Sequence, residues 1–401
     1  MKTVKRICII MILIMLCAVP FTGISESEQA RELTKHCDID ASPYQNVKKS
    51  ICNYDLWSRQ KFDPGFGITV SWNETIEARY LCLQWHSLPQ QVTVRLFDEN
   101  QQVRSEWILH SDPDSVISLP SDIRSVSLTA GEQGMVLSQL HVFSDGTLPS
   151  PYHLWTETPQ HLDYLLISTH PDDDILYLGS VVPIYGGEQG YTGSIVYVTS
   201  SPRERMTEAE NGSWEMGLRY RPIFLNFPDV NHKAPKWLKD TFRYDELLLA
   251  TVRIYRQYHP LVVFAQDING EYGHWQHQLT SKASIEAYSL AADPSYDKDS
   301  AAEYGTWQVQ KLYLHIYPDN PLILDADKPL EAFNGNNAFT VAQKAFRKHE
   351  SQFKIGYSVE KDDNRFAFNR FGMICGQVEA GNDAFENIDE SLFYANNRKE
   401  P

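Results

Sequence analysis

The sequence predicts two structural parts, an N-terminal antiparallel β-sandwich and a C-terminal α/β domain with a mostly parallel sheet and flanking helices. The 401 residues suffice for two or three domains, and 42% hydrophobic with 22% charged residues is typical of globular chains. Before residue 150, short runs with β character follow one another. From about residue 162 onward, apolar runs of strand length alternate with helix-like segments, which indicates a parallel sheet.

Residues 26–147 are expected to form the sandwich. Five short runs are rich in Val, Leu and Ile, and turn residues separate them at intervals typical of such folds. The pattern resembles discoidin and galactose-binding-like sandwiches, which often accompany glycan-active enzymes. An accessory domain with no ligand is the alternative. The five runs are 78–85, 91–98, 115–120, 124–130 and 137–143.

The first 25 residues have the composition of a secretory signal peptide. Basic residues precede the apolar stretch 7–19, which is too short to span a bilayer comfortably. Gly23 and Ser25 are small residues at the spacing of a cleavage site before Glu26. We therefore expect a secreted or extracytoplasmic protein with no integral membrane segment in the mature chain. An uncleaved N-terminal segment that anchors the chain is the alternative.

Charge and cysteine content limit the partners and the cross-links. A net charge of −16 and a pI near 5.2 argue against binding of nucleic acid. Beyond the expected signal peptide, Cys37, Cys52, Cys82 and Cys375 permit three pairings, and Cys37 with Cys52 is the local candidate. Four buried free thiols fit the sequence equally well. The oligomeric state does not follow from the sequence.

Residues 148–160 are rich in proline and small polar residues and are expected to link the sandwich to an α/β domain at 161–401. In this domain we expect strands at 164–168, 193–200, 222–227 and 261–267, and helices at 174–187, 206–218 and 243–258. Ligands bind such sheets beyond the carboxyl ends of the strands. The loops after the first and the fourth strand both carry histidines, so these loops are expected to meet.

The first of these loops reads "HPDDD", from His170 to Asp174. Read alone, the aspartates have an ordinary explanation, because one carboxylate can cap the following helix and the others favour its positive end. Asp172 and Asp174 also satisfy the Asp-x-Asp metal motif of glycosyltransferases. A lone His170 is more often packed or exposed than a ligand.

The second loop makes a metal site the better interpretation. His274 and His277 are three residues apart, which places both imidazoles on one face if a helix begins here. Together with the first loop they supply His, Asp and His for one divalent cation. Two histidines and one carboxylate leave a position open for water, as a catalytic zinc site requires.

These motifs resemble the PIG-L/LmbE-like N-deacetylases, zinc hydrolases that act on N-acetylglucosaminyl compounds. The family pattern is His-Pro-Asp-Asp-Glu, then Arg-x-x-Glu before a Leu-Gly, then Tyr-Gly-His-x-x-His. The chain has "HPDDD" at 170–174, "RMTE" at 205–208 before "MGL" at 216–218, and "YGHWQH" at 272–277. "HESQ" at 349–352 resembles a further recurrent segment, so the resemblance covers about residues 160–400. It implies a Rossmann-like sheet.

Carried over by residue, the resemblance makes His170, Asp173 and His277 ligands of Zn²⁺ or of another divalent transition metal. Asp172 becomes the general base. His274 and Tyr272 stabilise the oxyanion, with His274 a candidate to protonate the amine, and Arg205 contacts substrate. Asp174 departs from the pattern, since the family has glutamate there, and "WQ" replaces the usual Pro-Asp between the histidines. Asp267 is expected either to orient His274 or to cap its loop. Arg203 and Glu208 contact substrate or belong to a solvated helix start.

The sequence therefore predicts a secreted, zinc-dependent carbohydrate N-deacetylase that hydrolyses an amide bond. Its expected partner is an N-acetylglucosamine-type sugar or glycan, whose identity and chain length stay open. A metal-dependent glycosyltransferase and a non-catalytic glycan-binding protein are the alternatives. The first leaves "YGHWQH" without a role, and the second leaves an intact ligand set unexplained.

Overall fold

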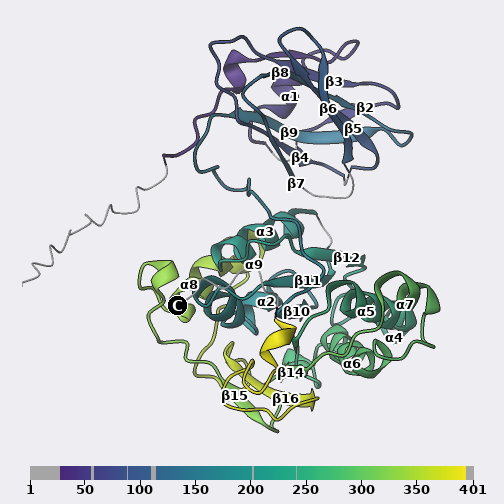
Figure 1. Ribbon diagram of the computed structural model, residues 1–401, viewed down its shortest axis with the longest axis vertical. Coiled ribbons are helices and arrows are strands. Elements are labelled where there is room, and N and C mark those ends of the chain that lie inside the picture. Colours follow the sequence, from purple (N-terminus) through teal and green to yellow (C-terminus); the bar gives the residue numbers. More distant parts are fainter. Residues whose placement is uncertain are drawn as a thin grey trace, which may run out of the picture.

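The computed structural model describes residues 28–55, 58–87, 89–109, 114–200, 203–240 and 242–393. Within these ranges the chain forms a β-sandwich followed by an α/β body (Figure 1). The expected signal peptide, residues 1–25, lies outside the described residues. Of the helices in the described part, none has both the length and the apolar character needed to cross a bilayer.

The sandwich consists of two antiparallel sheets, and the side chains that alternate along their strands supply its core. In β5, for example, Val92, Val94 and Leu96 are buried against the opposite sheet, as a strand with one covered face requires. The expected disulfide between Cys37 and Cys52 is absent, because both are free thiols in the structure, as is Cys375 in the second body. One sheet has the order β1 (Asp38–Asp40), β3 (Gly67–Ser71), β8 (Ile123–Thr129), β5 (Val92–Asp98) and β6 (Val103–Leu109); the other has β2 (Gln60–Phe62), β9 (Met135–Phe143), β4 (Tyr80–Trp85) and β7 (Asp114–Ser118), with α1 at Val47–Ile51.

The α/β body is built on one sheet with a parallel centre and an antiparallel edge. Strands β12, β11, β10, β13 and β14 run parallel; β16 pairs antiparallel with β14, and β15 pairs antiparallel with β16. The order is β12 (Ile223–Phe227), β11 (Gly193–Thr199), β10 (Tyr164–Ser168), β13 (Val262–Ala265), β14 (Lys311–His315), β16 (Arg370–Gly376) and β15 (Pro321–Ile323). The four strands expected from the sequence are β10 to β13, whereas β14 to β16 were not anticipated.

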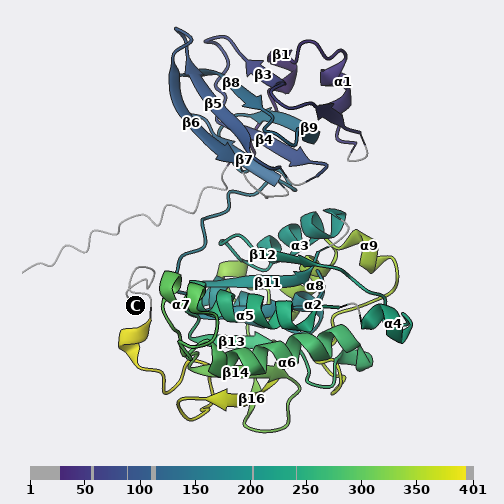
Figure 2. The same ribbon diagram turned by 90° about the vertical axis from the view of Figure 1, so that its right-hand side faces the viewer.

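Helices cover both faces of this sheet (Figures 1 and 2). In β10, Leu165 and Ile167 belong to the core under α5 and α6, while Leu166 faces the core under α2, α3 and α8. This alternation is why the central strands read as unbroken apolar runs. The helices are α2 (Asp173–Leu176), α3 (Arg203–Glu215), α4 (Lys236–Lys239), α5 (Tyr244–Tyr258), α6 (Trp275–Leu290), α7 (Lys298–Tyr304), α8 (Ala338–Phe346) and α9 (Glu350–Phe353).

The helix expected over 174–187 is split into two pieces. α2 has one turn, and a π-helical segment follows at Val182–Glu188. Gly179 between them approaches the carbonyl oxygen of Ile175 so closely that a Cβ at this position would lie 2.2 Å from it. The chain therefore leaves α2 by a tight turn, which shortens the helix that follows the first histidine loop.

The segment 148–160 contains no helix or strand, yet two adjacent residues inside it pack against the sandwich and against the α/β body. Tyr152 is buried with Phe143 of the sandwich, whereas the next residue, His153, stacks on Trp214 of α3. The Nε2 atom of His153 also lies 2.8 Å from Oδ1 of Asn211. Adjacent residues thus pack on different bodies, so the connection is short.

Arg256 of α5 is a fully buried cation that holds the end of α6 and the start of α7. Its guanidinium donates to five backbone carbonyls and to the hydroxyl of Ser300, at 2.7–3.1 Å. Carbonyls at a helix C-terminus carry partial negative charge, which compensates the buried cation. The carbonyls belong to Leu290, Ala291, Asp293, Tyr296 and Asp297.

We expect Arg256→Met to lower the free energy of unfolding by about 3 kcal/mol or more, because it leaves several buried acceptors without a donor. Arg253→Met on the same helix is the matched control. Arg253 is 48% exposed and pairs with Asp297 at the surface, so its loss costs about 1 kcal/mol or less. Urea unfolding measures both values, and equal losses would contradict this role of Arg256.

Candidate metal centre

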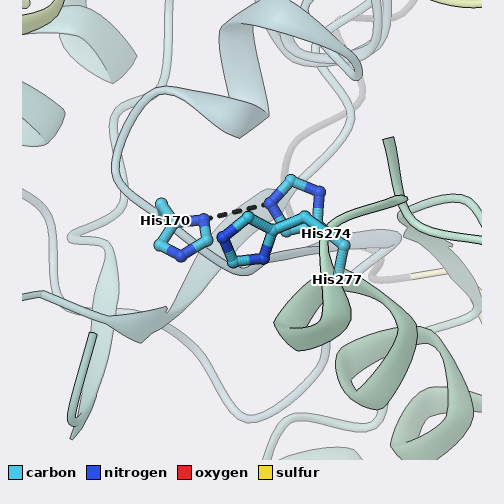
Figure 3. A group of neighbouring side chains, drawn as sticks. All are labelled: His170, His274 and His277. Atoms are coloured by element: carbon cyan, nitrogen blue, oxygen red, sulfur yellow. Dashed lines mark hydrogen bonds between the residues drawn. The ribbon is translucent and has the colours of Figure 1, made fainter. Parts of the chain in front are cut away.

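The two histidine loops meet at the carboxyl edge of the sheet. β10 and β13 are neighbouring parallel strands, so the loops that follow them leave at the same edge. One ring nitrogen from each of His170, His274 and His277 can be chosen so that all three lie within 4.8 Å of one another (Figure 3). The structure thus brings together the histidines singled out in the sequence.

Asp173 completes a tighter set with two of these histidines. Its Oδ2 atom lies 2.9 Å from Nδ1 of His170 and 3.1 Å from Nε2 of His277, and these two nitrogens are 3.1 Å apart. Neighbouring ligand atoms in a tetrahedral zinc site are separated by about 3.3 Å, given metal–ligand distances of ~2.0–2.1 Å. The donor set therefore fits a small divalent cation, and His170, Asp173 and His277 form a more compact site than the three histidines.

The charges in this set are matched. Burial alone would raise the pKa of Asp173, but His277 and His170 bring it well below its ordinary value. Burial alone would lower the pKa of His277, whereas the carboxylates of Asp173 and Glu271 raise it to about 10. A metal ligand must give up its proton. A bound cation would therefore take the place of the positive charge that a proton supplies here.

The aspartate triplet does not cap α2. Asp172 occupies the N-cap position, but its side chain makes no capping hydrogen bond, and its backbone has φ = +129°. Such a φ strains a residue other than glycine, and strain of this kind concentrates at functional sites. Asp174 is fully buried, accepts a hydrogen bond from the backbone N–H of Asp172 at 3.2 Å, and has a pKa raised to about 7 by burial. The aspartates therefore have three different environments.

Asp172 lies against Arg205 of α3. Nη2 of Arg205 is 3.0 Å from Oδ1 of Asp172, and the same group donates to the carbonyl of Pro171. Burial raises the pKa of Asp172 well above its ordinary value, although the guanidinium opposes this shift. Oε2 of Glu208 lies 3.9 Å from Nε of Arg205. The same carboxylate accepts hydrogen bonds from the backbone N–H and the hydroxyl of Ser351. The segments "RMTE" and "HESQ" are therefore one connected arrangement.

His274 ends the loop and caps α6. Its Nδ1 atom accepts a hydrogen bond from the backbone N–H of Gln276 at 3.3 Å, so the proton of the neutral ring is on Nε2. Burial and the neighbouring His277 and His170 lower the pKa of His274 to about 3. His274 has extended backbone angles and lies before the helix, whereas His277 is inside it. The imidazole of His274 is therefore positioned by the extended end of the loop, and that of His277 by the first turn of α6.

Tyr272 stands at the mouth of the site. The residue is 46% exposed. Its backbone is left-handed, with φ = +47°, and the nearby Gly270 and Gly273 also have positive φ. Asp267 lies farther back, and its Oδ1 accepts a hydrogen bond from the backbone N–H of Asn269 at 3.0 Å. Of the two expectations for Asp267, the structure shows the loop cap.

A cleft of about 460 Å³ opens over these groups. This volume is within the range of pockets for small molecules. Asp229 is one of its charged residues, and its Oδ1 lies 3.6 Å from Nε2 of His170. The loop that carries Asp229 contains no recognisable motif, so this residue was not among the sequence-predicted site residues. Besides the residues already discussed, the lining includes Asp229, Asn231, His232, Lys233, Gln352 and Tyr357.

Two buried residues behind His277 were also missed. Glu271 accepts a hydrogen bond from Nδ1 of His277 at 2.7 Å, and His315 of β14 contacts the other carboxylate oxygen at 2.8 Å. Glu271 directly precedes the "YGHWQH" segment, so its acidic side chain was a weak indication in the sequence of a partner for these histidines. His315 ends a strand that was not anticipated.

Alanine substitutions should separate the two possible ligand sets. We expect Asp173→Ala to abolish stoichiometric zinc binding, as should His170→Ala and His277→Ala. His274→Ala should retain about one zinc per chain, because His274 is outside the compact set. Mass spectrometry of the metal content, with circular dichroism as the folding control, makes the measurement. Retained zinc in Asp173→Ala together with loss in His274→Ala would favour the three-histidine site instead.

Comparison with known proteins places this geometry in context. Residues 165–288 match the PIG-L family, described as GlcNAc-PI de-N-acetylase. A deacetylase of 1D-myo-inositol 2-acetamido-2-deoxy-alpha-D-glucopyranoside from Frankia casuarinae is 39% identical over 183 residues, covering 37% of this chain and 57% of that protein. The chain spans 57–62% of the length of the first curated relatives it matches.

Two solved structures are similar to different parts of the chain. The N,N'-diacetylchitobiose deacetylase from Pyrococcus horikoshii is 19% identical, covering 53% of this chain and 83% of that chain with a TM-score of 0.39. The family 32 CBM from C. perfringens NanJ in complex with galactose is 9% identical, covering 29% of this chain and 99% of that chain with a TM-score of 0.24. The family match includes both histidine loops and the strands that carry them, so residues 165–288 form a PIG-L domain.

Proposed function

We propose that this protein is a secreted, zinc-dependent N-deacetylase that releases acetate from an N-acetylglucosamine-type sugar or glycan. One observation carries the proposal. A compact His–Asp–His donor set lies at the base of a cleft, with a second carboxylate, Asp172, next to it. The deacetylase relatives support the reaction class. Secretion rests on the composition of residues 1–25 alone.

His170, Asp173 and His277 would hold the metal, which when bound acidifies water and polarises an amide carbonyl. Asp172 takes the proton from the attacking water and later delivers it to the leaving nitrogen. Its burial suits the first of these steps, because a carboxylate whose pKa is raised accepts a proton more readily. Arg205 fixes the carboxylate in place through the contact at 3.0 Å.

His274 and Tyr272 face the cleft as hydrogen-bond donors for the developing oxyanion. His274 donates through Nε2–H, because its Nδ1 is occupied by the backbone N–H of Gln276. A single donor of this kind contributes roughly 2.7–4 kcal/mol to transition-state stabilisation in other enzymes. His274 thus acts as a neutral donor, and Asp172 is the group that protonates the amine.

The glycosyltransferase alternative fits the site less well. The Asp-x-Asp interpretation needs Asp172 and Asp174 together in the site, but Asp174 is fully buried and does not line the cleft. Asp172 is paired with Arg205 instead. A glycan-binding protein without activity would have no need for the strained backbone at Asp172.

The sandwich is proposed to bind glycan and to keep the α/β body close to a polymeric substrate. Its neighbour, the linker, is ordered by His153 against α3, so the distance between the two bodies is short. A short connection raises the effective concentration of one site for a ligand bound at the other.

The central test is release of acetate from N-acetylglucosamine, N,N'-diacetylchitobiose and longer chitooligosaccharides by the zinc-loaded protein. We expect Asp172→Asn to keep its zinc and to lose about 10²–10⁴-fold in kcat, because it removes the base and leaves the ligand set intact. Ser351→Ala is the matched control, since it alters only the distant support of Glu208.

Two results would contradict the proposal. A zinc-loaded wild-type protein that releases no acetate from any of these sugars would refute the reaction class. An Asp172→Asn variant with a kcat near that of the wild type would show that another group accepts the proton.

A further inference from the structure

Glu271 and His315 form a buried pair directly behind the metal site. The side chains of Glu271, His277 and His315 are all fully buried. Oε2 of Glu271 lies 2.7 Å from Nδ1 of His277, and Oε1 lies 2.8 Å from Nδ1 of His315. The backbone N–H of Asp267 also donates to Oε1 at 3.1 Å. One carboxylate thus receives three donors in a region without solvent.

This arrangement determines which nitrogen of His277 carries the proton. A carboxylate can only accept a hydrogen bond, so Nδ1 of His277 must carry the hydrogen. The lone pair of the neutral ring is then on Nε2, the atom that faces Asp173 and His170. We propose that Glu271, supported by His315, is a positioning residue that holds His277 in the tautomer and orientation required to bind the metal. This assignment rests on the proposed metal site and extends it inward by two residues.

His315 holds the other oxygen of the buried carboxylate. Its Nδ1 lies 2.8 Å from Oε1 of Glu271, and its second nitrogen, Nε2, lies 3.1 Å from the carbonyl oxygen of Ala367. Because His315 is fully buried and both of its ring nitrogens have partners, it fixes Oε1 and leaves Oε2 to accept from Nδ1 of His277. His315 therefore orients the carboxylate that in turn orients His277.

The pair also has a purely structural explanation, because it joins β14 to the loop before α6. The two explanations differ in what a neutral, isosteric side chain does. In Glu271→Gln one of the two oxygens becomes an NH₂ group, which must point either at Nδ1 of His277 or at the two donors on the other side, His315 and the N–H of Asp267. Packing is preserved, but Nδ1 of His277 no longer has an obligatory acceptor, so its tautomer and ring orientation are no longer fixed.

The test is the zinc dissociation constant, measured by competition with a chelating dye on the full chain. We expect Glu271→Gln to raise this constant about 10–100-fold, the usual effect of losing such an outer partner. Asp267→Asn is the matched control, because its carboxylate is in the same loop and caps Asn269 without contacting the histidines. It should change the constant less than about threefold.

The outcomes are distinguishable. Unchanged zinc affinity in a folded Glu271→Gln variant overturns this assignment and leaves the proposed function intact. If the wild type itself binds no zinc, the metal site fails, and the assignment fails with it. If Glu271→Gln does not fold in chelator, His315→Leu replaces it, since this change removes the imidazole that holds Oε1 and keeps the carboxylate. Weaker zinc binding in His315→Leu then supports the pair, and wild-type affinity overturns it.

Discussion

The site depends on buried carboxylates whose charge must be balanced. Asp172, Asp173 and Glu271 are all at most 5% exposed, and isolated carboxylates at such depth would be very costly. Each lies against its own partners, because Asp172 meets Arg205, Glu271 lies between His277 and His315, and Asp173 lies between two imidazole nitrogens. The last of these arrangements is also a donor set that fits a cation, so the three buried carboxylates have different chemical surroundings.

The sheet order makes this balance possible. β10 lies beside β13, and β13 lies beside β14, so three adjacent parallel strands bring Asp173, Glu271 and His315 to one edge. Arg205 arrives from α3, which follows β11 on the other side of β10. Residues that are distant in the sequence meet because parallel strands all end at the same edge. The fold thus supplies the counter-charges, and the loops supply the ligands.

That the candidate ligands lie close together could be predicted from the sequence, because these residues belong to short local motifs. "HPDDD" and "YGHWQH" each flank a strand that reads as an apolar run, and the structure places both at the carboxyl edge. The sequence could not predict His315, whose partner is 44 residues away and whose strand was not anticipated. The spacing of His274 and His277 predicted that both lie on one face of a helix, but His274 has an extended backbone and precedes α6. Local patterns indicate ligands, whereas long-range pairing determines their outer partners.

At Gln276 the chain departs from the family pattern, and the side chain at this position makes a contact that an acidic residue could not make. The resemblance places an acidic residue there, beside His274. In this chain the backbone N–H of Gln276 donates to His274, while its side chain accepts from the N–H of Val230 and donates to the carbonyl of Pro228, at 3.1 and 2.9 Å. Those two residues hold the loop that places Asp229 and His232 in the cleft. A carboxylate could not make the second bond, because it has no hydrogen to donate. Glutamine therefore couples the orientation of His274 to the position of a cleft wall, and the tautomer of His274 is set by the backbone.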